Sequence, residues 1–250
     1  TFSDAGYRVG ALVIDASLFV PQSRPRLFVV GVRRDVEIDP ALLSPGPVAP
    51  FHTKGLQNAV DRVPEATRED WLWWNLPTPP VRNSCFADLI EETPTGVTWH
   101  TPEETAALLK SMSPLNLSKV AAAKRAGRRM VGGVYKRTRP SAPDGKTVRA
   151  EVRFDDIAGC LRTPAGGSSR QTVIVVDGKT VRSRLISSRE AARLMGLPDD
   201  YRLPTAYNES YHLVGDGVAV PAVRFLAAHL LEPLLSPAAA TEIDGAVEAA

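Results

Sequence analysis

Short runs of apolar and β-branched residues mark the first strands of the chain. Tyr7 to Ile14 and Arg26 to Val32 each have the composition of a buried strand, and the residues from Phe19 to Ser23 between them are turn-like. Two strands alone leave most of their apolar surface uncovered. We therefore expect this pair to belong to a larger α/β sheet whose other strands precede Thr1.

The pattern changes twice in the next hundred residues. Val36 to Pro80 is dense in proline, which predicts largely irregular connections, with tryptophans that anchor a loop rather than bind a ligand. Thr101-Pro102-Glu103-Glu104 has the residues of a capping box, so a helix should begin there. We expect this helix to break near Pro114, to resume from Ser118 to Ala126 and to stop at Gly127.

The second half of the chain alternates between apolar and polar residues over short stretches, which predicts a small β-rich domain. The expected strands surround two turns and cover Tyr135 to Arg139, Val148 to Phe154, Thr172 to Val176 and Thr180 to Leu185. Ser187 to Glu190 is a second capping box that opens a short helix. A last helix is expected from about Val220 to Leu235.

Composition narrows the class of protein. With 250 residues and 44% hydrophobic content, the chain can bury a core, and its apolar runs are too short for the roughly 18 residues of a membrane span. Because it begins with Thr1 rather than Met, we interpret it as part of a longer polypeptide. Two distant cysteines and four scattered histidines argue against a disulfide framework or a metal site and fit a reducing, cytoplasmic compartment.

The net charge of +2 hides an uneven distribution. From Lys119 to Arg153 there are eleven Lys or Arg residues and only two acids. Such a segment suits contacts with phosphate groups, and the candidates at the end of the expected helix and directly after it are Lys124, Arg125, Arg128 and Arg129. A solvated basic helix followed by a loop is the alternative interpretation.

Three further segments carry candidate functional residues. In the segment from Pro21 to Arg26, the side chains of Gln22, Arg24 and Arg26 recur at period two and could share one face that suits a phosphate or a base; a surface arginine pair is the alternative. The segment from Arg184 to Pro198 is a capped helix to which we assign a structural role. The segment from Gly215 to Pro221 is a glycine turn before the last helix.

In this order the three segments resemble the carboxy-terminal motifs of the DNA cytosine-5 methyltransferases, namely Q-x-R-x-R, R-x-L-(S/T)-x-R-E-x-x-R-L-x-G-F-P and G-N-(S/G)-V. The resemblance covers about residues 6 to 34 and 155 to 230. It implies the edge of a Rossmann-like S-adenosylmethionine-dependent methyltransferase sheet plus a small β-rich target recognition domain. The implied domains are 1–35, the end of the catalytic domain; 36–213, a connection and the recognition domain; 214–236, a cofactor-wall turn and returning helix; and 237–250, a flexible tail.

The resemblance also implies roles for single residues. Arg26 would contact the flipped cytosine with Gln22 and Arg24 in support, and the cofactor wall would comprise Gly215, Asp216, Gly217 and Val218. A glycine-rich recognition loop would read DNA through Arg162, Thr163, Gly166, Gly167, Ser168, Ser169, Arg170 and Gln171. Asp216 stands where the family usually has Asn, which would change the charge of a cofactor contact. Cys160 stands where the family usually has Thr, so the phosphate contact expected from the Thr hydroxyl would be missing.

The family's remaining motifs do not occur in these 250 residues: there is no F-x-G-x-G loop, no P-C-Q nucleophile and no E-N-V acid, and neither Cys85 nor Cys160 lies in such a context. We therefore expect the carboxy-terminal part of a bacterial or phage-type methyltransferase, acting on double-stranded DNA with a missing amino-terminal catalytic half and inactive alone. Alternatives are the DNA-recognition subunit of a split methyltransferase, a non-catalytic DNA-binding module, or an unrelated α/β domain with a basic face.

Overall fold

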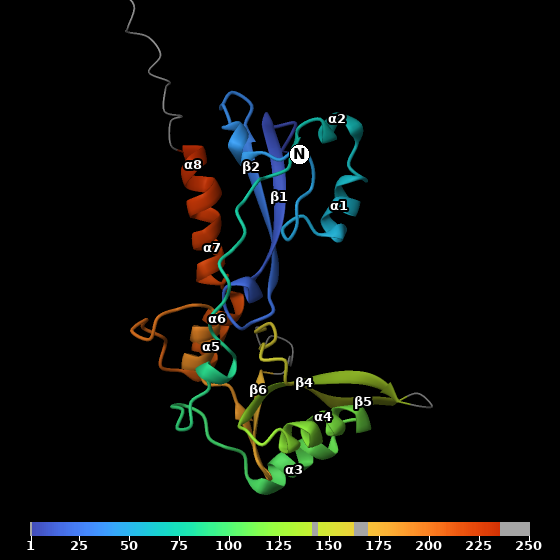
Figure 1. The fold of residues 1–250 in the computed structure, drawn as a ribbon, viewed down its shortest axis with the longest axis vertical. Helices are drawn as coiled ribbons and strands as arrows, with labels where there is room; N and C mark the ends of the chain where they lie inside the picture. The colour runs from blue at the N-terminus through green and yellow to red at the C-terminus, as the bar shows by residue number, and fades with distance from the viewer. Residues whose placement is uncertain (1, 142–144, 163–169, 236–250) are drawn as a thin grey trace, which may run out of the picture. The chain divides into compact units, whose positions relative to one another are not determined.

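The computed structural model describes residues 2–141, 145–162 and 170–235, which form two compact units (Figure 1). The first unit comprises residues 2–14, 26–79 and 223–235 of the described chain. The second comprises residues 15–25 and 80–222.

The first unit contains a three-stranded sheet of order β2-β1-β3. β1 spans Tyr7–Asp15 and β2 spans Pro25–Arg33, which confirms both predicted strands. β3, Trp71–Leu72, pairs in parallel with β1. The apolar centre of β1 is almost fully buried, because Ala11, Leu12 and Ile14 are all at most 2% exposed.

The proline-rich stretch contains more regular structure than predicted. Besides β3, it holds α1, Lys54–Val60, and α2, Glu65–Arg68. The side chain of Thr53 accepts a hydrogen bond from the backbone of Leu56, so a local cap starts α1 despite the surrounding prolines. The rest of the stretch is irregular, as predicted, and Trp74 is fully buried, in keeping with an anchoring role.

The second unit contains a four-stranded antiparallel sheet of order β5-β4-β6-β7. Its strands confirm the predicted β-rich region, with β4 starting five residues before the expected Tyr135. Their bounds are Met130–Ser141 for β4, Gly145–Arg153 for β5, Thr172–Asp177 for β6 and Thr180–Leu185 for β7.

Helices cover both faces of this sheet. α3, Pro102–Lys110, and α4, Pro114–Arg125, contribute to a core that includes Ile174 and Val176 of β6. The alternate residues of β6, Val173 and Val175, join a second core with α5, Ser188–Leu194, and α6, Tyr207–Asp216. We call these the α3–α4 face and the α5–α6 face. Burial on both sides explains why β6 is apolar throughout rather than alternating.

Both capping boxes are confirmed, at Thr101 and Ser187. The expected resumption of the second helix at Ser118 was wrong: α4 begins at Pro114, because Ser113 caps it and proline is well suited to the first helical position. α6 was not predicted, and it has no side-chain cap at its start.

The last predicted helix is observed as α7, Val220–Leu226, a π-helical turn over Ala227–Leu231 and α8, Glu232–Leu235. By length and composition alone, Tyr207–Leu235 could cross a membrane. However, residues 217–219 are not helical, and Tyr211 and Val214 belong to the core of the second unit. Tyr207–Leu235 is therefore not one continuous helix, and α6 is a core element of the second unit.

Candidate functional site

The side chain of Gln22 is buried and holds two segments of the chain together by hydrogen bonds. Its side-chain amide donates to the carbonyl of Leu194 at 2.7 Å, and its amide oxygen accepts the backbone N–H of Leu161 at 3.2 Å. The side chain is fully buried. One residue of the first motif therefore joins the end of α5 to the segment that leads into the expected recognition loop.

Arg24 makes a second and larger set of buried contacts. One guanidinium nitrogen, Nη1, donates to the carbonyl of Leu161 at 2.8 Å. The other, Nη2, donates to the carbonyls of Gly215 at 2.6 Å and Gly217 at 2.8 Å. The side chain is only 1% exposed. A planar fork can satisfy several carbonyls at once, so Arg24 fixes the glycine turn after α6 relative to Leu161.

Local backbone bonds hold this motif in place. The backbone N–H of Arg24 donates to the carboxylate of Asp15 at 2.8 Å, which also caps the turn at Ala16–Leu18. Gln22 forms an isolated parallel bridge with Ala158. These bonds place Gln22 and Arg24 inside the second unit. Both side chains therefore have a structural role. Of Gln22, Arg24 and Arg26, only Arg26, which is half-buried on β2, has an accessible side chain.

The expected cofactor wall lies where α6 ends and α7 begins. Gly215 and Asp216 close α6, and Gly217 caps it. The carbonyls of both glycines accept bonds from Arg24, whereas Asp216 is exposed and Val218 is 40% exposed. Asp216 and Val218 are therefore the members of this wall whose side chains face solvent.

The expected recognition loop is described only at its two ends. Thr163, Gly166, Gly167, Ser168 and Ser169 lie outside the described residues. Arg162 is exposed, while Gln171 is 4% exposed and its backbone N–H donates to the Tyr211 hydroxyl at 3.0 Å. The side chain of Gln171 consequently packs inside the domain instead of facing a groove.

Arg170 is oriented by two residues of α6. Its guanidinium donates to the side-chain oxygen of Asn208 at 2.5 Å and lies 5.5 Å from the centre of the Tyr207 ring. These three side chains border a pocket of about 550 Å³, whose other lining residues are Gly96, Val97, Thr98, His100, Leu185 and Ala206. A guanidinium beside an amide and an aromatic face is suited to a planar hydrogen-bonding group such as a base.

Tyr207 and Asn208 were missed by sequence reasoning. Neither lies in a recognisable motif, and α6 has no side-chain cap that would have revealed it. Burial raises the pKa of the Tyr207 hydroxyl well above its ordinary value, so it remains a neutral donor, and it donates to the carbonyl of Ile186 at 2.9 Å. The ring is thereby fixed as a platform beneath Arg170.

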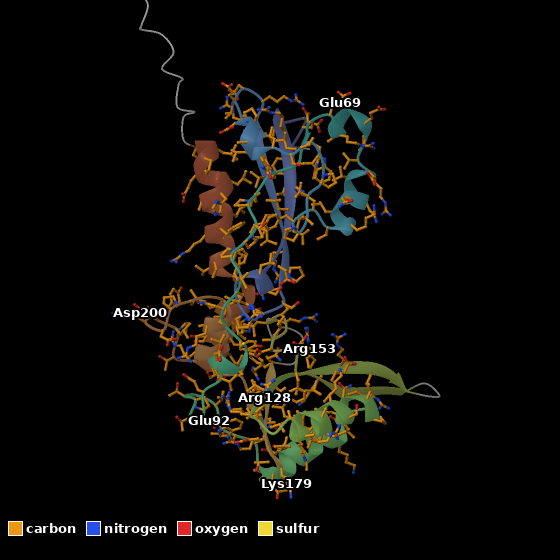
Figure 2. All side chains as sticks on the ribbon, in the orientation of Figure 1. Glu69, Glu92, Arg128, Arg153, Lys179 and Asp200 are labelled. Atoms are coloured by element: carbon orange, nitrogen blue, oxygen red, sulfur yellow. The ribbon has the colours of Figure 1, made fainter. Side chains whose placement is uncertain are left out.

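The four cations expected on the α4 segment are not equivalent. Lys124, Arg125 and Arg128 are exposed, and within the described part of the chain no acidic partner holds them. Arg129 is different, because its guanidinium lies 3.0 Å from the carboxylate of Glu92. Figure 2 labels Arg128 and Glu92 in this region. The charges of Lys124, Arg125 and Arg128 are therefore available to a polyanion.

The two cysteines have different surroundings. Both are free thiols. A hydrogen bond to Asp156, followed by desolvation, raises the pKa of the exposed Cys85 thiol, which favours the unreactive protonated form. Cys160 lies 3.4 Å from Nη1 of Arg24 in the architecture described above. Among the described residues, no cluster of His, Cys, Asp or Glu could hold a metal ion.

A family model described as C-5 cytosine-specific DNA methylase matches residues 1–232. Among curated relatives, type II methyltransferase M1.ScrFI of Lactococcus lactis subsp. cremoris is 38% identical over 61 residues, which are 24% of this chain and 16% of that protein. DNA (cytosine-5)-methyltransferase CMT2 of Oryza sativa subsp. japonica is 33% identical over 85 residues, 33% of this chain and 6% of that protein.

A third relative, type II methyltransferase M.BsuFI of Bacillus subtilis, is 41% identical over 61 residues, 24% of this chain and 15% of that protein. The matched segments thus span about a sixth or less of the relatives' own lengths. Among solved structures, the S. pombe Dnmt2 methyltransferase aligns with 94% of this chain and 60% of that chain, at 15% identity and a TM-score of 0.40.

Proposed function

Because this chain belongs to the C-5 cytosine-specific DNA methylase family, we propose that it is the carboxy-terminal part of a DNA cytosine-5 methyltransferase. The complete enzyme would transfer a methyl group from S-adenosylmethionine to C5 of a flipped cytosine in a specific duplex site. Flipping is needed because the target atoms are stacked inside the duplex. The observation that carries the proposal is the buried network in which Gln22 and Arg24 join the three motif segments.

This network gives each segment a role. Arg24 holds the glycine turn by the carbonyls of Gly215 and Gly217 and also holds Leu161, directly before the recognition loop. One guanidinium therefore links Leu161 to the glycine turn. We propose that Gln22 and Arg24 are positioning residues and that Arg26 contacts the flipped cytosine at O2.

The residues near the turn fit one side of a site for S-adenosylmethionine, which supplies the methyl group when bound. Asp216 and Val218 offer a carboxylate and an apolar side chain, respectively, to a ligand with polar and apolar parts. The glycine carbonyls are engaged by Arg24 and so stiffen this wall rather than bind the ligand. The remaining walls would come from an amino-terminal catalytic half.

Recognition of duplex DNA is assigned to the second unit. Arg162 and Arg170 flank the recognition loop, and Arg170 is presented by Tyr207 and Asn208 at the edge of a pocket. Arginine can make a bidentate contact with guanine in the major groove. The exposed cations Lys124, Arg125 and Arg128 add attraction that is independent of sequence.

The test is transfer of tritiated methyl groups to duplex DNA. The isolated chain should be inactive, because it lacks the nucleophile motif, and a chain that includes the upstream catalytic half should methylate cytosine. In that longer protein, Arg26→Ala should abolish turnover while DNA binding persists. Arg33→Ala is the matched control, since Arg33 lies on the same strand and is 65% exposed beside Asp35. Incorporation by the isolated chain would contradict the proposal.

The alternative is the DNA-recognition subunit of a split methyltransferase or a non-catalytic DNA-binding module. The upstream reading frame separates these proposals. A continuous frame that encodes P-C-Q and E-N-V supports a single enzyme, whereas translation that begins at this point supports a separate subunit. Restored activity on mixing with a separately encoded catalytic chain would establish the split arrangement, and failure with every such chain would favour the non-catalytic module.

A further inference from the structure

The hairpin of β4 and β5 extends beyond the rest of its sheet (Figure 1). β4 pairs with β6 only from Met130 to Val134, yet it continues to Ser141 and remains paired with β5 over that whole extension. The outer half is thus a two-stranded ribbon. A ribbon of this kind is narrow enough to enter the major groove of duplex DNA or to lie along its phosphates.

Two arginines face each other across this ribbon. Arg137 is directly opposite Arg149 in the strand register, and both side chains are exposed. Like charges directly opposite on one face of a sheet are destabilising. Arg137 has partial relief, because its Nε lies 3.3 Å from the carboxylate of Glu151, whereas Arg149 has no acidic partner among the described residues. A bound polyanion would remove this repulsion.

Strand alternation places this pair on a definite side of the sheet. Val134, Ala150 and Val152 belong to the core of the α3–α4 face. Side chains of odd-numbered residues here lie on the other face, so Arg137, Arg149 and Arg153 share the α5–α6 face. The cations of α4, by contrast, belong to the helix layer over the α3–α4 face.

The expected recognition loop begins on the same side as this arginine pair. Tyr135, on the face of Arg137, lies so close to Gly159 that a Cβ there would come within 1.7 Å of the Tyr135 hydroxyl oxygen. Glycine is therefore required at this crossing, three residues before the exposed Arg162. The chain that leads into the loop passes against the base of the ribbon.

We propose that the outer β4–β5 hairpin is a DNA-contacting arm in which Arg137 and Arg149 bind phosphates beside the site read by the recognition loop. This inference rests on the proposed DNA-binding function and adds a surface to it. Each neutralised phosphate releases counterions, and the slope of log affinity against log salt changes by roughly 0.9 per phosphate on B-form DNA.

The experiment compares the whole 250-residue chain with its variants by fluorescence anisotropy on a mixed-sequence DNA duplex over a range of salt concentrations. Arg137→Gln/Arg149→Gln should flatten the slope by as much as roughly 1.8, the value for two phosphates. The Arg137→Lys/Arg149→Lys double variant should retain most of the slope because it retains the charge. The matched control is Lys110→Gln/Lys179→Gln, which removes the same charge from exposed positions elsewhere in the unit. Figure 2 shows Lys179 away from Arg153, which lies on β5, the strand that carries Arg149.

Thermal unfolding supplies the second readout. Arg149→Gln should have a Tm equal to or above that of the parent chain, because the cross-strand repulsion is removed, while its DNA affinity falls. The inference would be overturned if Arg137→Gln/Arg149→Gln changed the salt slope no more than Lys110→Gln/Lys179→Gln does. Weaker DNA binding by Arg149→Gln together with a lower Tm would overturn it as well. If the parent chain itself does not bind duplex DNA, the proposed function fails, and this outcome is distinct from failure of the hairpin alone.

Discussion

The guanidinium of Arg184 lies 2.6 Å from the carboxylate of Glu190, and neither side chain is exposed to solvent. The carboxylate also accepts the backbone N–H groups of Ser187 and Glu91, both at 2.8 Å. Arg184 donates in addition to the carbonyl of Glu91 at 2.7 Å. The pair thus ties β7, the capping box of α5 and the segment before α3 into one buried unit.

The first prediction concerns this pair. Glu190→Gln should lower the free energy of unfolding by about 3 to 5 kcal/mol, because it leaves the Arg184 charge buried without its counterion. Glu92→Gln is the control: its side chain is 55% exposed, so removal of its ion pairs should cost about 1 kcal/mol or less. Urea unfolding measures both. An equal loss of unfolding free energy in the two variants would show that the buried pair stabilises the fold no more than an exposed one.

Arg24 provides the second prediction. Arg24→Lys keeps the charge but replaces a planar fork with a single ammonium group. We expect the unfolding free energy to fall by about 1 to 3 kcal/mol for each buried carbonyl left without a donor. Hydrogen exchange should also accelerate at the amide of Val220, which donates to Met195 just beyond the turn.

Arg33→Lys is the same substitution at an exposed position, so it should change neither the free energy of unfolding nor the exchange rate at Val220. If Arg24→Lys lowered the overall stability while exchange at Val220 rose no more than elsewhere, Arg24 would be a general core residue instead of the clamp of the glycine turn.

The contrast between Ser187 and Arg24 shows what the sequence could reveal. The capping boxes at Ser187 and Thr101 were predicted correctly, because both partners of a cap lie within three residues. The three carbonyls that accept hydrogen bonds from the Arg24 guanidinium lie 137 to 193 residues away, so no local pattern could indicate that this arginine is buried. α6 was missed for a related reason: burial of Tyr211 and Val214, rather than a cap, stabilises it.

The third prediction concerns the reactivity of Cys85. The hydrogen bond to Asp156 raises the pKa of the thiol, so less thiolate is present at neutral pH and alkylation should be slow. Asp156→Asn removes the carboxylate charge, which should lower the pKa and speed the reaction. Asn also tolerates the positive φ of 62° at this position.

The measurement is the rate of iodoacetamide modification against pH, with peptide mapping to separate Cys85 from Cys160. The parent chain should become reactive only at higher pH than the variant. Rapid modification of Cys85 in the parent chain at neutral pH would contradict this interpretation and reopen the question of a nucleophile in this segment.

The fourth prediction concerns the exposed cations at the end of α4 and just after it. Neutralising Lys124, Arg125 and Arg128 to glutamine should weaken binding equally on all duplex sequences and flatten the salt slope by as much as roughly 0.9 for each phosphate that these side chains neutralise. Arg129→Gln should have a smaller effect, because Glu92 already neutralises this charge. Anisotropy titrations measure the slope. An unchanged slope in the triple variant would place α4 away from DNA.

The last prediction assigns base recognition to Arg170. Its guanidinium is fixed by Asn208 and by the Tyr207 ring, so it meets a base edge in a defined orientation. Arg170→Ala should therefore cost on the order of 1 to 3 kcal/mol at one base position. Asn208→Ala should weaken the preference at the same position by less, since it loosens the orientation of Arg170 but leaves its charge.

Arg170→Lys separates charge from geometry. Lysine retains the attraction to phosphate but has no planar fork, so the salt slope should persist while the base preference declines. The measurement is binding to a library of duplexes that differ at single positions, once the preferred site has been selected from random sequence. Equal weakening of Arg170→Ala on every duplex would make Arg170 a phosphate contact, because a base reader loses affinity only where its base is present.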